Sequence, residues 1–332
     1  MSQVISWVVG RGGLLGGAVE TAIAKQGQVW HPPFDINWSE FRLAQDQLQS
    51  ACRSFAETSG PSSWQIAWCA GPGISTTSSR SLTQETQHIT LLLNEIARAF
   101  GPTRLQSGAL FLSSSAGGVY GASPAAPHDE GSLLLPATPY GFNKVAQESL
   151  VSRWNRETGV PVLIGRISNL YGPRQNPFKG QGLITQVCLH TLTRRPLILR
   201  VPMDTIRDYI YAEDAGCLIS RALTRLRDEQ ASHSVVVKIV ASHRPVTIGY
   251  IFAQVRLVLK RPLTVLVANA AETKQEPRDL RLVSTIWADL DRCQTTSLPE
   301  GIRTVVNGLM VMTSRGRFAM QAFATGGPRS AD

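Results

Sequence analysis

Tyr140 and Lys144 lie four residues apart in the stretch TPYGFNKVAQESL, which spans residues 138–150. A proline precedes the pair, and the small and apolar residues that follow are typical of a helix. Side chains at positions i and i+4 lie on one face of a helix, one turn apart, so the phenol and the ammonium are expected to be neighbours. Such a pair is either an ordinary surface contact or part of a catalytic site, and the rest of the sequence has to decide.

Three glycines, Gly10, Gly13 and Gly16, are spaced three residues apart in the stretch VVGRGGLLGG. They follow an apolar run at 4–10 that predicts a buried strand, and they precede a stretch that predicts a helix. Glycines in this position permit a tight turn, so that backbone N–H groups at the helix N-terminus can approach a pyrophosphate. This context favours a dinucleotide-binding turn over a turn that serves packing alone.

An acidic residue at the end of the second strand would bind the adenosine ribose of a dinucleotide. Here that strand, GQVWH, ends at His31, and the first acidic candidate is Asp35, nineteen residues after Gly16. Arg11, beside the glycines, is suited to a 2′-phosphate instead. We therefore expect NAD as the cofactor and leave NADP open.

The order of the predicted elements indicates an α/β fold with a parallel, doubly wound sheet. Apolar runs alternate with helical stretches, and short buried strands are expected at 4–10, 64–71, 109–115 and 160–170. After about residue 172 the pattern becomes irregular, which predicts a smaller substrate-binding region. The predicted division is a dinucleotide-binding domain at 1–170 that also receives 205–245, a substrate-binding region at 171–204 and 246–312, and a flexible tail at 313–332.

The composition is that of an ordinary globular protein, with 43% hydrophobic and 17% charged residues in a chain of 332. A formal net charge of +9 suggests an anionic partner. The arginines are dispersed without a basic block, which favours a phosphorylated small molecule over nucleic acid. The sequence contains neither an apolar run long enough for a transmembrane segment nor a signal peptide, and its five cysteines lack metal-type spacing. We therefore expect a cytoplasmic protein with reduced thiols and no metal site.

Five motifs then follow one another in a recognisable order. They are the glycine turn near residue 10, SSSAGGVYG at 113–121, PYGFNK at 139–144, RISNLYGPRQN at 166–176 and RDYIYAEDAG at 207–216. Over roughly residues 4–310 the chain resembles the extended short-chain dehydrogenase/reductase family, in particular its nucleotide-sugar epimerases and dehydratases. The resemblance implies a Rossmann-type sheet, a nucleotide-sugar substrate, and a homodimer formed through a helix bundle that includes the Tyr140 helix.

By this resemblance, Tyr140 and Lys144 are the catalytic pair, and Tyr140 takes the proton from a sugar hydroxyl as hydride leaves the same carbon. A free phenol has a pKa of ~10, and lowering it by ~3 units requires ~4 kcal/mol. A positive charge ~4 Å away supplies about that much at an effective dielectric near 20, and the family's lysine also holds the nicotinamide ribose. The third member is a serine at the end of the preceding strand, where the register of the loop selects Ser115 over its neighbours Ser114 and Ser113.

The resemblance also implies the residues that contact the two ligands. The expected cofactor contacts, besides Tyr140 and Lys144, are Gly10, Arg11, Gly13, Leu14, Leu15, Gly16, Asp35, Ile36, Ala70 and Gly71. The expected contacts to the substrate diphosphate are Asn169, Arg207 and Arg278. Arginine suits this task because its planar fork donates two hydrogen bonds to phosphate oxygens. The alternative for Arg207 is a surface ion pair with Asp208 or Asp214.

The loop after Ser115 discriminates between the reactions of the family. Dehydratases carry an acidic pair there, whereas this chain has Ala116, Gly117 and Gly118, which transfer no proton. The predicted function is therefore an NAD(P)-dependent epimerase that acts at C4 of a nucleotide sugar through a 4-keto intermediate. The alternatives are an NADPH-dependent 4-ketoreductase and a non-catalytic dinucleotide-binding protein.

Three positions depart from the family pattern. The acid of the second strand is missing, and the turn before RDY reads RVPMDTI, without its usual glycine. The asparagine expected in the helix after CAG is not evident, and His88 lies near its place.

Overall fold

The computed structural model describes residues 4–71, 73, 77–123, 126–229, 234–267 and 277–314. The predicted tail at 313–332 lies outside these residues except for its first two positions. The chain forms two compact units. Unit 1 comprises Met1–Leu170, Ile206–Pro245 and Pro277–Thr295, and unit 2 comprises Tyr171–Thr205, Val246–Glu276 and Thr296–Asp332.

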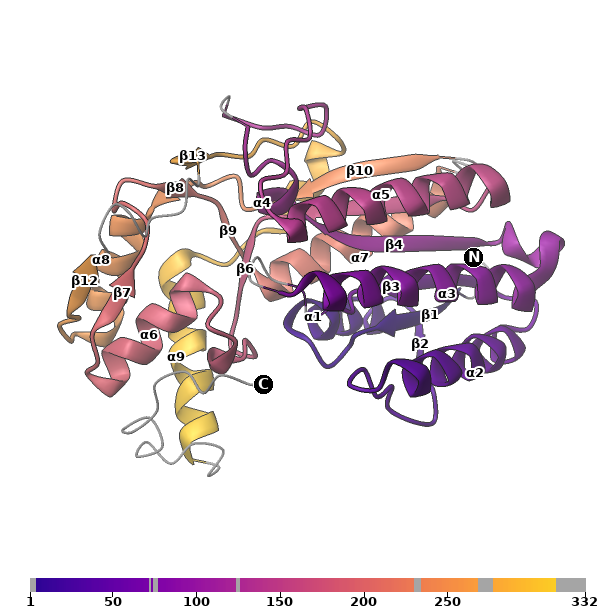
Figure 1. Ribbon diagram of the computed structural model, residues 1–332, viewed down its shortest axis with the longest axis horizontal. Helices are drawn as coiled ribbons and strands as arrows, with labels where there is room; N and C mark the ends of the chain where they lie inside the picture. The colour runs from indigo at the N-terminus through magenta and orange to yellow at the C-terminus, as the bar shows by residue number, and fades with distance from the viewer. Residues whose placement is uncertain are drawn as a thin grey trace. The chain divides into compact units, whose positions relative to one another are not determined.

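Unit 1 is built on a six-stranded sheet with the order β10-β5-β4-β3-β1-β2 (Figure 1). Every neighbouring pair of strands in this sheet is parallel. The strands are β1 (Val4–Val9), β2 (Gln28–Trp30), β3 (Ser63–Trp68), β4 (Gly108–Ser115), β5 (Val162–Ile167) and β10 (Val235–Val240). The helices of unit 1 are α1 (Leu14–Ala24), α2 (Phe41–Ser59), α3 (Ser79–Leu105), α4 (Ala116–Val119), α5 (Pro139–Thr158) and α7 (Ala212–Asp228).

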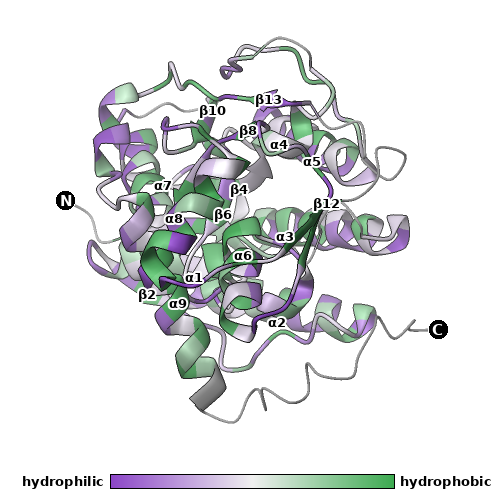
Figure 2. Cartoon of the chain, turned by 90° about the vertical axis from the view of Figure 1, so that its left-hand side faces the viewer, coloured by the Kyte–Doolittle hydropathy of each residue, from purple (hydrophilic) through white to green (hydrophobic). Residues whose placement is uncertain are grey.

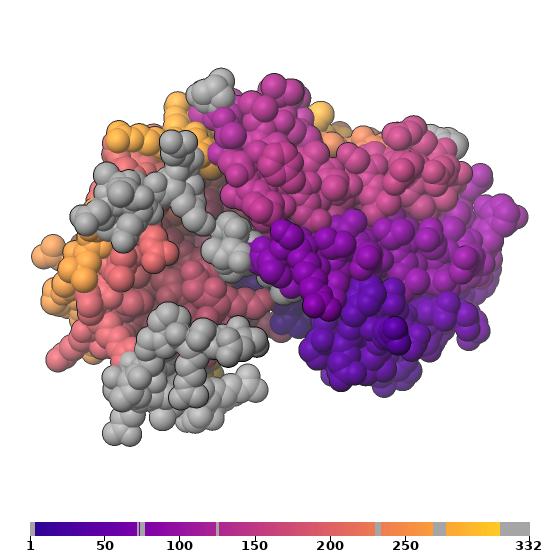
Figure 3. Space-filling view, viewed as in Figure 1, coloured from indigo at the N-terminus to yellow at the C-terminus, as the bar shows by residue number. Residues whose placement is uncertain are grey.

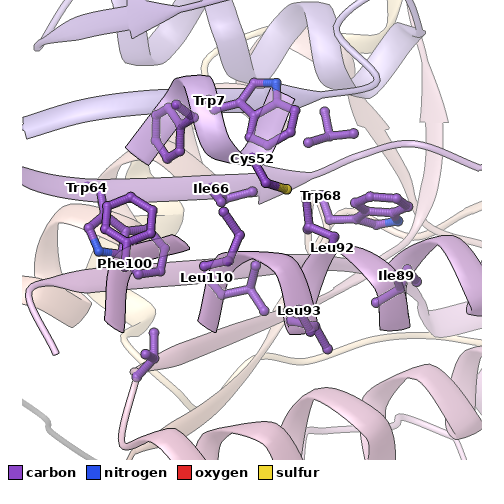
Figure 4. Close-up of a cluster of buried hydrophobic side chains, with 14 of the residues drawn as sticks. Trp7, Cys52, Trp64, Ile66, Trp68, Ile89, Leu92, Leu93, Phe100 and Leu110 are labelled. Atoms are coloured by element: carbon purple, nitrogen blue, oxygen red, sulfur yellow. The ribbon is translucent and has the colours of Figure 1, made fainter. Parts of the chain in front are cut away.

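Helices cover both faces of the sheet. One face packs against α2, α3 and α5 in a cluster rich in aromatic residues, and α3 and α5 cross in front of the sheet in Figure 1. Side chains from the strands and from α3 point toward one another in Figure 4, among them Trp7, Ile66, Trp68, Leu110, Leu92 and Phe100. The other face packs against α1 and α7, whose apolar residues form a second cluster. The predicted Rossmann-type doubly wound sheet is therefore confirmed.

The helix α5 begins and ends where its sequence requires. The hydroxyl of Thr138 accepts a hydrogen bond from the Gly141 backbone, and Pro139 occupies the first helical position. Gly159 ends the helix in the left-handed conformation that glycine adopts without a steric penalty. The pair Tyr140 and Lys144 is consequently held in the first two turns of a well-defined helix.

The strand order changes direction between β1 and β3. The chain leaves β1 toward β2 on one side and returns to β3 on the other side, so the carboxyl ends of β1 and β3 border the crevice where ligands bind in open α/β sheets. Gly10 and Ala70 follow these two strands, and a Cβ built on Gly10 would lie 2.6 Å from the Ala70 nitrogen. The two predicted cofactor-binding segments are therefore in contact.

Unit 2 is smaller and contains the helices α6 (Leu183–Thr193), α8 (Ile248–Leu259) and α9 (Leu298–Ser314), which pack on one another. In Figure 2 these helices carry hydrophobic residues on part of their surface and hydrophilic residues on the rest. The strands β7 (Leu197–Leu199) and β12 (Val265–Val267) form a parallel pair. The remaining elements among the described residues are β6 (Asn169–Tyr171), β8 (Ile206–Arg207), β9 (Tyr209–Tyr211), β11 (Val246–Thr247), β13 (Asp279–Leu280) and the 3-10 helices η1 (Pro177–Lys179) and η3 (Ala288–Cys293).

Two features differ from the sequence analysis. The segment 277–295 groups with unit 1 rather than with the substrate-binding region, because β13 pairs with β8. The helix α2 lies in a stretch for which no element was predicted. The five cysteines are all free thiols, and no helix in the described part of the chain is long and apolar enough to cross a membrane.

Candidate active site

The glycines in the turn between β1 and α1 are of two kinds: some are required by the backbone of the turn, and others border open space. Gly10 has φ +91°, and a Cβ on Gly16 would lie 2.2 Å from the Gly10 carbonyl oxygen, so these two glycines are required by the turn itself. A Cβ on Gly13 would meet only that oxygen, at 3.3 Å, and a Cβ on Gly12 would meet nothing within 4 Å. Gly12 and Gly13 therefore leave open space above the turn.

The N-terminus of α1 borders this space. Gly13 occupies the N-cap position, so no side chain caps the first backbone N–H groups, and the first turn of α1 contains no acidic residue. Leu14 and Leu15 continue the helix, half-buried beneath the turn. An uncapped helix N-terminus above a glycine turn fits the pyrophosphate of a dinucleotide, because N–H donors and the helix dipole both favour negative charge.

Glu20 of α1 brings together two basic residues near the ends of β1 and β2. Its Oε1 lies 3.6 Å from Nη1 of Arg11 and 3.2 Å from Nε2 of His31. Asp35 is exposed and Ile36 is half-buried against the core of unit 1. An acid, Glu20, therefore does lie near the end of β2, although the sequence did not indicate it, and it is paired with these two basic groups.

Ser115 and Tyr140 meet at Gly118. A Cβ on Gly118 would lie 3.2 Å from Cε1 of Tyr140 and 3.4 Å from Oγ of Ser115, so both side chains flank this glycine. Ser115 is the last residue of β4 and the N-cap of α4, and its hydroxyl accepts a hydrogen bond from the Gly118 backbone at 3.1 Å. A Cβ on Gly141 would lie 2.2 Å from the Gly118 carbonyl oxygen, which shows how closely α5 approaches this loop.

The two other serines of β4 are engaged elsewhere. The hydroxyl of Ser114 donates to Oε1 of Glu148 at 2.5 Å. Ser113 is buried and presents its carbonyl oxygen to Nζ of Lys144 at 3.4 Å. The structure therefore brings Ser115, and not its neighbours, to the ring of Tyr140.

Lys144 is buried and held by protein acceptors. Its Nζ donates to Oε1 of Glu85 at 2.9 Å and to Oε1 of Gln147 at 3.0 Å, and it lies 5.7 Å from the centroid of the Tyr140 ring. Burial disfavours the charged form of this ammonium, but the neighbouring Tyr140 and Glu85 outweigh burial, so the pKa of Lys144 is raised above its ordinary value.

Glu85 is the residue of this site that the sequence analysis missed. It lies on α3, and its carboxylate also accepts a hydrogen bond from Nε2 of Gln147 at 3.0 Å. A Cβ on Gly71, which has φ +143°, would lie 2.7 Å from Oε1 of Glu85, so the carboxylate adjoins the segment after β3. Its sequence signal is an acid within the apolar stripe of α3, three residues after Leu82 and four before Ile89, both of which are buried.

His88, one helical turn after Glu85, belongs to an aromatic cluster. Its ring centroid lies 5.4 Å from that of Trp38 and 4.8 Å from that of Phe41. Burial lowers the pKa of His88, so its imidazole is neutral at neutral pH. The residue near the family's asparagine position thus packs against aromatic rings.

The three predicted diphosphate-binding residues all lie in unit 1. The exposed Asn169 donates from its side chain to the Asp208 carbonyl oxygen at 2.8 Å. Arg207 is buried and donates to the Ile206 carbonyl oxygen at 2.9 Å. Its strand pairs with β13, which follows directly on the exposed Arg278. Asn169 and Arg207 therefore lie on the strands β6 and β8, and Arg278 directly precedes β13, the partner of β8.

The carboxylate of Asp208 does not form a surface ion pair. It is buried, and its carboxylate accepts hydrogen bonds from the backbone and hydroxyl of Ser242 and from the Arg244 backbone. This side chain therefore anchors the loop after β10, which is a structural task.

A glycine turn at the switch point of a parallel sheet is the arrangement of a Rossmann-type dinucleotide-binding fold, and Ser115, Tyr140 and Lys144 lie on the neighbouring elements β4 and α5. The sequence profile of the NAD dependent epimerase/dehydratase family matches residues 7–237. The chain belongs to this family, which confirms the resemblance inferred from the motifs. Because the family is NAD dependent, the cofactor is NAD(P).

Curated relatives match over part of the chain. The chain is 34% identical over 116 residues to the dTDP-glucose 4,6-dehydratase of Salmonella typhimurium, a match that covers 32% of this chain and 31% of the relative. It is 35% identical over 109 residues to a trifunctional dehydratase, epimerase and reductase of UDP-sugars from Arabidopsis thaliana, covering 32% of this chain and 16% of that protein. The match spans only about a third or less of the length of these relatives.

Solved structures match over most of the chain and share its fold. The UDP-glucose 4-epimerase of Thermotoga maritima superposes with a TM-score of 0.72 at 18% identity, covering 93% of this chain and 99% of that one. An RMD structure from Pseudomonas aeruginosa complexed with NADPH superposes with a TM-score of 0.70 at 20% identity, covering 93% of this chain and 97% of that one.

Proposed function

We propose that the chain is an NAD(P)-dependent epimerase that acts at C4 of a nucleotide sugar through a 4-keto intermediate. The observation that carries the proposal is the meeting of Ser115 and Tyr140 at Gly118, with Lys144 one helical turn further along α5. A phenol and a hydroxyl on either side of a glycine can address the same substrate oxygen, which the transfer of a proton at one carbon requires.

Each side chain has a distinct role in this proposal. Tyr140 removes the proton of the C4 hydroxyl and later returns a proton to the same oxygen, while the Ser115 hydroxyl donates a hydrogen bond to that oxygen. The bound nicotinamide supplies the acceptor and donor of hydride. Gly12, Gly13 and the N-terminus of α1 would hold its pyrophosphate, and Ala70 and Gly71 would line its path along the ends of the strands.

The loop after Ser115 supports redox at one carbon rather than dehydration. Ala116 and Gly118 are buried, Gly117 has no side chain, and the three residues form α4 together with Val119. Elimination of water needs an additional acid and base near the sugar. In α4 there is no side chain that can supply either.

The substrate diphosphate is proposed to contact Asn169, Arg207 and Arg278. Arg207→Ala is expected to weaken binding of a nucleoside diphosphate sugar and of the bare nucleoside diphosphate roughly 10- to 150-fold, the loss of one charge-assisted contact. A nucleoside without phosphates should bind almost as before, and isothermal calorimetry measures all three. Equal weakening of the three ligands would instead mean that Arg207 supports the fold.

The proposal is tested by incubating the protein with NAD and each of several UDP- and dTDP-sugars while following the anomeric protons by NMR. Interconversion of two sugars that differ only at C4, without net change in absorbance at 340 nm, supports the epimerase. Tyr140→Phe is the inactive control. Loss of water from the sugar, or no turnover of any nucleotide sugar, contradicts the proposal.

A second candidate, an NADPH-dependent 4-ketoreductase, is favoured by one observation. Arg11 and His31 lie together beside Glu20, near the end of β2, and basic groups there would suit the 2′-phosphate of NADPH. Stoichiometric consumption of NADPH with a 4-keto nucleotide sugar would support this candidate over the epimerase. Mass spectrometry under native conditions adds a second criterion, because an epimerase retains NAD⁺ through its cycle.

We also propose that the chain forms a homodimer through the outer faces of α3 and α5. These helices pack together and reach the surface of unit 1, where Figure 3 draws them in purple and magenta. Phe142 of α5 is 62% exposed there and would be buried by such a contact. Sedimentation velocity measures the state directly.

A further inference from the structure

A cavity opens at the amino ends of the strands of unit 1, at the edge of the sheet opposite to the glycine turn. Its volume is about 840 Å³, and it lies between the sheet and the C-terminal ends of α1 and α7. Ligand pockets in proteins have volumes of about 300–1,000 Å³. The lining residues of β1 begin at Val4, whereas Gly10 follows the other end of that strand, about 15–20 Å away. The cavity is therefore separate from the candidate active site.

The strands contribute polar side chains to the floor of this cavity. Ser6 of β1 and Gln65 of β3 are neighbours in the sheet register, and Nε2 of Gln65 donates to Oγ of Ser6 at 2.8 Å. Two residues further along the same strands, Val8 and Ala67 belong to the apolar cluster beneath α1 and α7. Because burying polar groups in an apolar core is costly, the polar pair marks the amino end of this sheet face as a surface that faces the cavity.

Amides and hydroxyls also form the walls of the cavity. Gln26 follows α1, Gln106 follows α3, and Ser220 and Thr224 lie on α7. The hydroxyl of Thr224 donates to Oε1 of Gln26 at 3.3 Å, so α1 and α7 are joined at this wall. Amides and hydroxyls both donate and accept hydrogen bonds. A lining of this kind matches a ligand with several hydroxyl groups, which also donate and accept.

Arg227, near the end of α7, brings a positive charge to the cavity. It is half-buried, and its Nη1 donates to Oε1 of Gln65, which is its one hydrogen bond to the residues that the structure describes. The acid that lines the cavity, Asp228, is exposed and forms no ion pair with Arg227. Burial lowers the pKa of the Arg227 guanidinium, because its charge is only partly solvated. Most of its N–H donors are therefore left for an anionic group in the cavity.

We propose that this cavity is a second ligand site of unit 1, which binds a sugar that carries one anionic group, a phosphate or a carboxylate. Arg227 binds the anionic group through its planar fork, while the amides and hydroxyls of the floor and walls bind the hydroxyl groups of the sugar. The proposal does not depend on the proposed epimerase, because no lining residue belongs to the candidate active site. The sugar and a dinucleotide can therefore be bound at the same time.

The experiment is isothermal calorimetry of the full chain with four probes: glucose 6-phosphate, glucuronate, glucose and inorganic phosphate. At least one of the two anionic sugars is expected to bind about 10-fold or more tightly than glucose and than phosphate, because only the anionic sugars use both Arg227 and the polar walls. Phosphate that binds as tightly as both anionic sugars would overturn the role of the walls. Glucose that binds as tightly would overturn the role of Arg227. Absence of binding by both anionic sugars at millimolar concentration would overturn the proposal as a whole.

Two variants test the lining itself. Arg227→Gln should weaken binding of the anionic sugars roughly 10- to 150-fold, the loss of one charge-assisted contact. Gln26→Glu keeps the shape of an exposed side chain and adds a negative charge, so it should weaken them roughly 5-fold even where Arg227→Gln fails to fold. Arg221→Gln is the matched control, because it removes the same charge from an exposed position of α7 that does not line the cavity, and it should bind as the parent does. Parent affinity in a folded Arg227→Gln or Gln26→Glu protein would overturn the proposal.

Two further variants locate the bound sugar. Arg207→Ala and Gly13→Val change the candidate active site at the other edge of the sheet, so both should bind the anionic sugars with the parent affinity. A loss of affinity in either variant would place the probe at the candidate active site and would overturn the proposal. Because no turnover is measured, these titrations decide the point even where the chain fails to act on a nucleotide sugar.

Discussion

Two buried ion pairs meet at α5, and they are completed differently. The pair of Glu148 and Arg166 is closed on all sides: Glu148 accepts from the Ser114 hydroxyl and from two nitrogens of Arg166, and Arg166 also donates to the Tyr120 hydroxyl. The pair of Lys144 and Glu85 leaves Oε2 of Glu85 without a partner among the described residues.

The difference separates a structural network from a site. Buried polar groups in stable folds are almost always hydrogen-bonded, so a complete network of buried charges indicates a part of the structure that holds helix and sheet together. Oε2 of Glu85 instead adjoins the glycines after β3. A Cβ on Gly71 or Gly73 would lie 2.8 or 2.9 Å from it, so this carboxylate lies beside the segment that is proposed to line the cofactor. The two pairs make this contrast testable with the same substitution.

Glu148→Gln is expected to cost the most stability. It leaves the buried Arg166 without its counter-charge, and breaking a buried pair in this way costs about 3–5 kcal/mol. Glu85→Gln should cost less, about 1–2 kcal/mol, because a buried lysine that loses its counter-charge can release its proton, which an arginine cannot. Urea unfolding followed by tryptophan fluorescence compares the two. Equal losses would abolish the distinction between them.

Tyr140→Phe is the counterpart on the side of chemistry. The hydroxyl is removed without disturbing either ion pair, so turnover should fall at least ~100-fold, the usual scale for a general acid or base. The free energy of unfolding should change little. Initial rates with the active nucleotide sugar measure the effect, and near-normal rates in the variant would exclude Tyr140 from proton transfer.

The glycine turn shows the same contrast between structural and ligand-facing residues. The expected effect of a substitution there is on cofactor affinity, and it is smaller. In Gly13→Val the new side chain fills the space above the turn while Gly10 and Gly16 keep the turn intact, so the affinity for NAD(P) should fall roughly 10- to 150-fold. Gly27→Val is the matched control, because Gly27 follows the other end of α1 and a Cβ there would meet only the Val4 carbonyl oxygen, at 3.5 Å. Fluorescence titration with NAD and NADP measures both variants, and unchanged affinity in Gly13→Val would make the turn a purely structural feature.

Glu130 gives the smallest effect and adds a dependence on pH. Burial would raise the pKa of its carboxyl, but hydrogen bonds from Ser284, Thr285 and Ile239 outweigh burial and lower it. A carboxyl with a depressed pKa stabilises the fold above the ordinary Glu pKa and loses that contribution as the pH falls through the folded value. Glu130→Gln should therefore be about 1 kcal/mol less stable at pH 7 and depend less on pH below about 5. A parallel pH profile for parent and variant would contradict this assignment.

Much of unit 1 could be predicted because its signals are local. The buried strands β1, β3, β4 and β5 are short apolar runs, and α5 carries both of its end signals within one stretch of sequence. The helix α2 was missed although its buried residues, among them Ala44, Leu48 and Phe55, recur at helical spacing, because polar residues separate them. The pairing of β13 with β8 could not be predicted, because each strand has two residues and their partners are distant in sequence.

The candidate site divides along the same line. Ser115, Tyr140 and Lys144 belong to two local motifs whose spacing is visible in the sequence. Glu85 contacts Lys144, which is 59 positions away in the chain. A buried acid in the apolar stripe of a helix does not by itself indicate which residue it pairs with. Glu20 is a similar case, because the ends of α1 and β2 bring it to Arg11 and His31 only in the folded chain.

The aromatic core of unit 1 also determines what spectroscopy can see. All seven tryptophans of the chain belong to unit 1, and Trp7, Trp64 and Trp68 are almost fully buried in the cluster of Figure 4. Intrinsic tryptophan emission therefore reports on unit 1 alone, whereas circular dichroism at 222 nm sums the helices of both units. If unit 2 melts at a lower denaturant concentration, the dichroism will change before the emission does, and the two curves will separate without any label being attached.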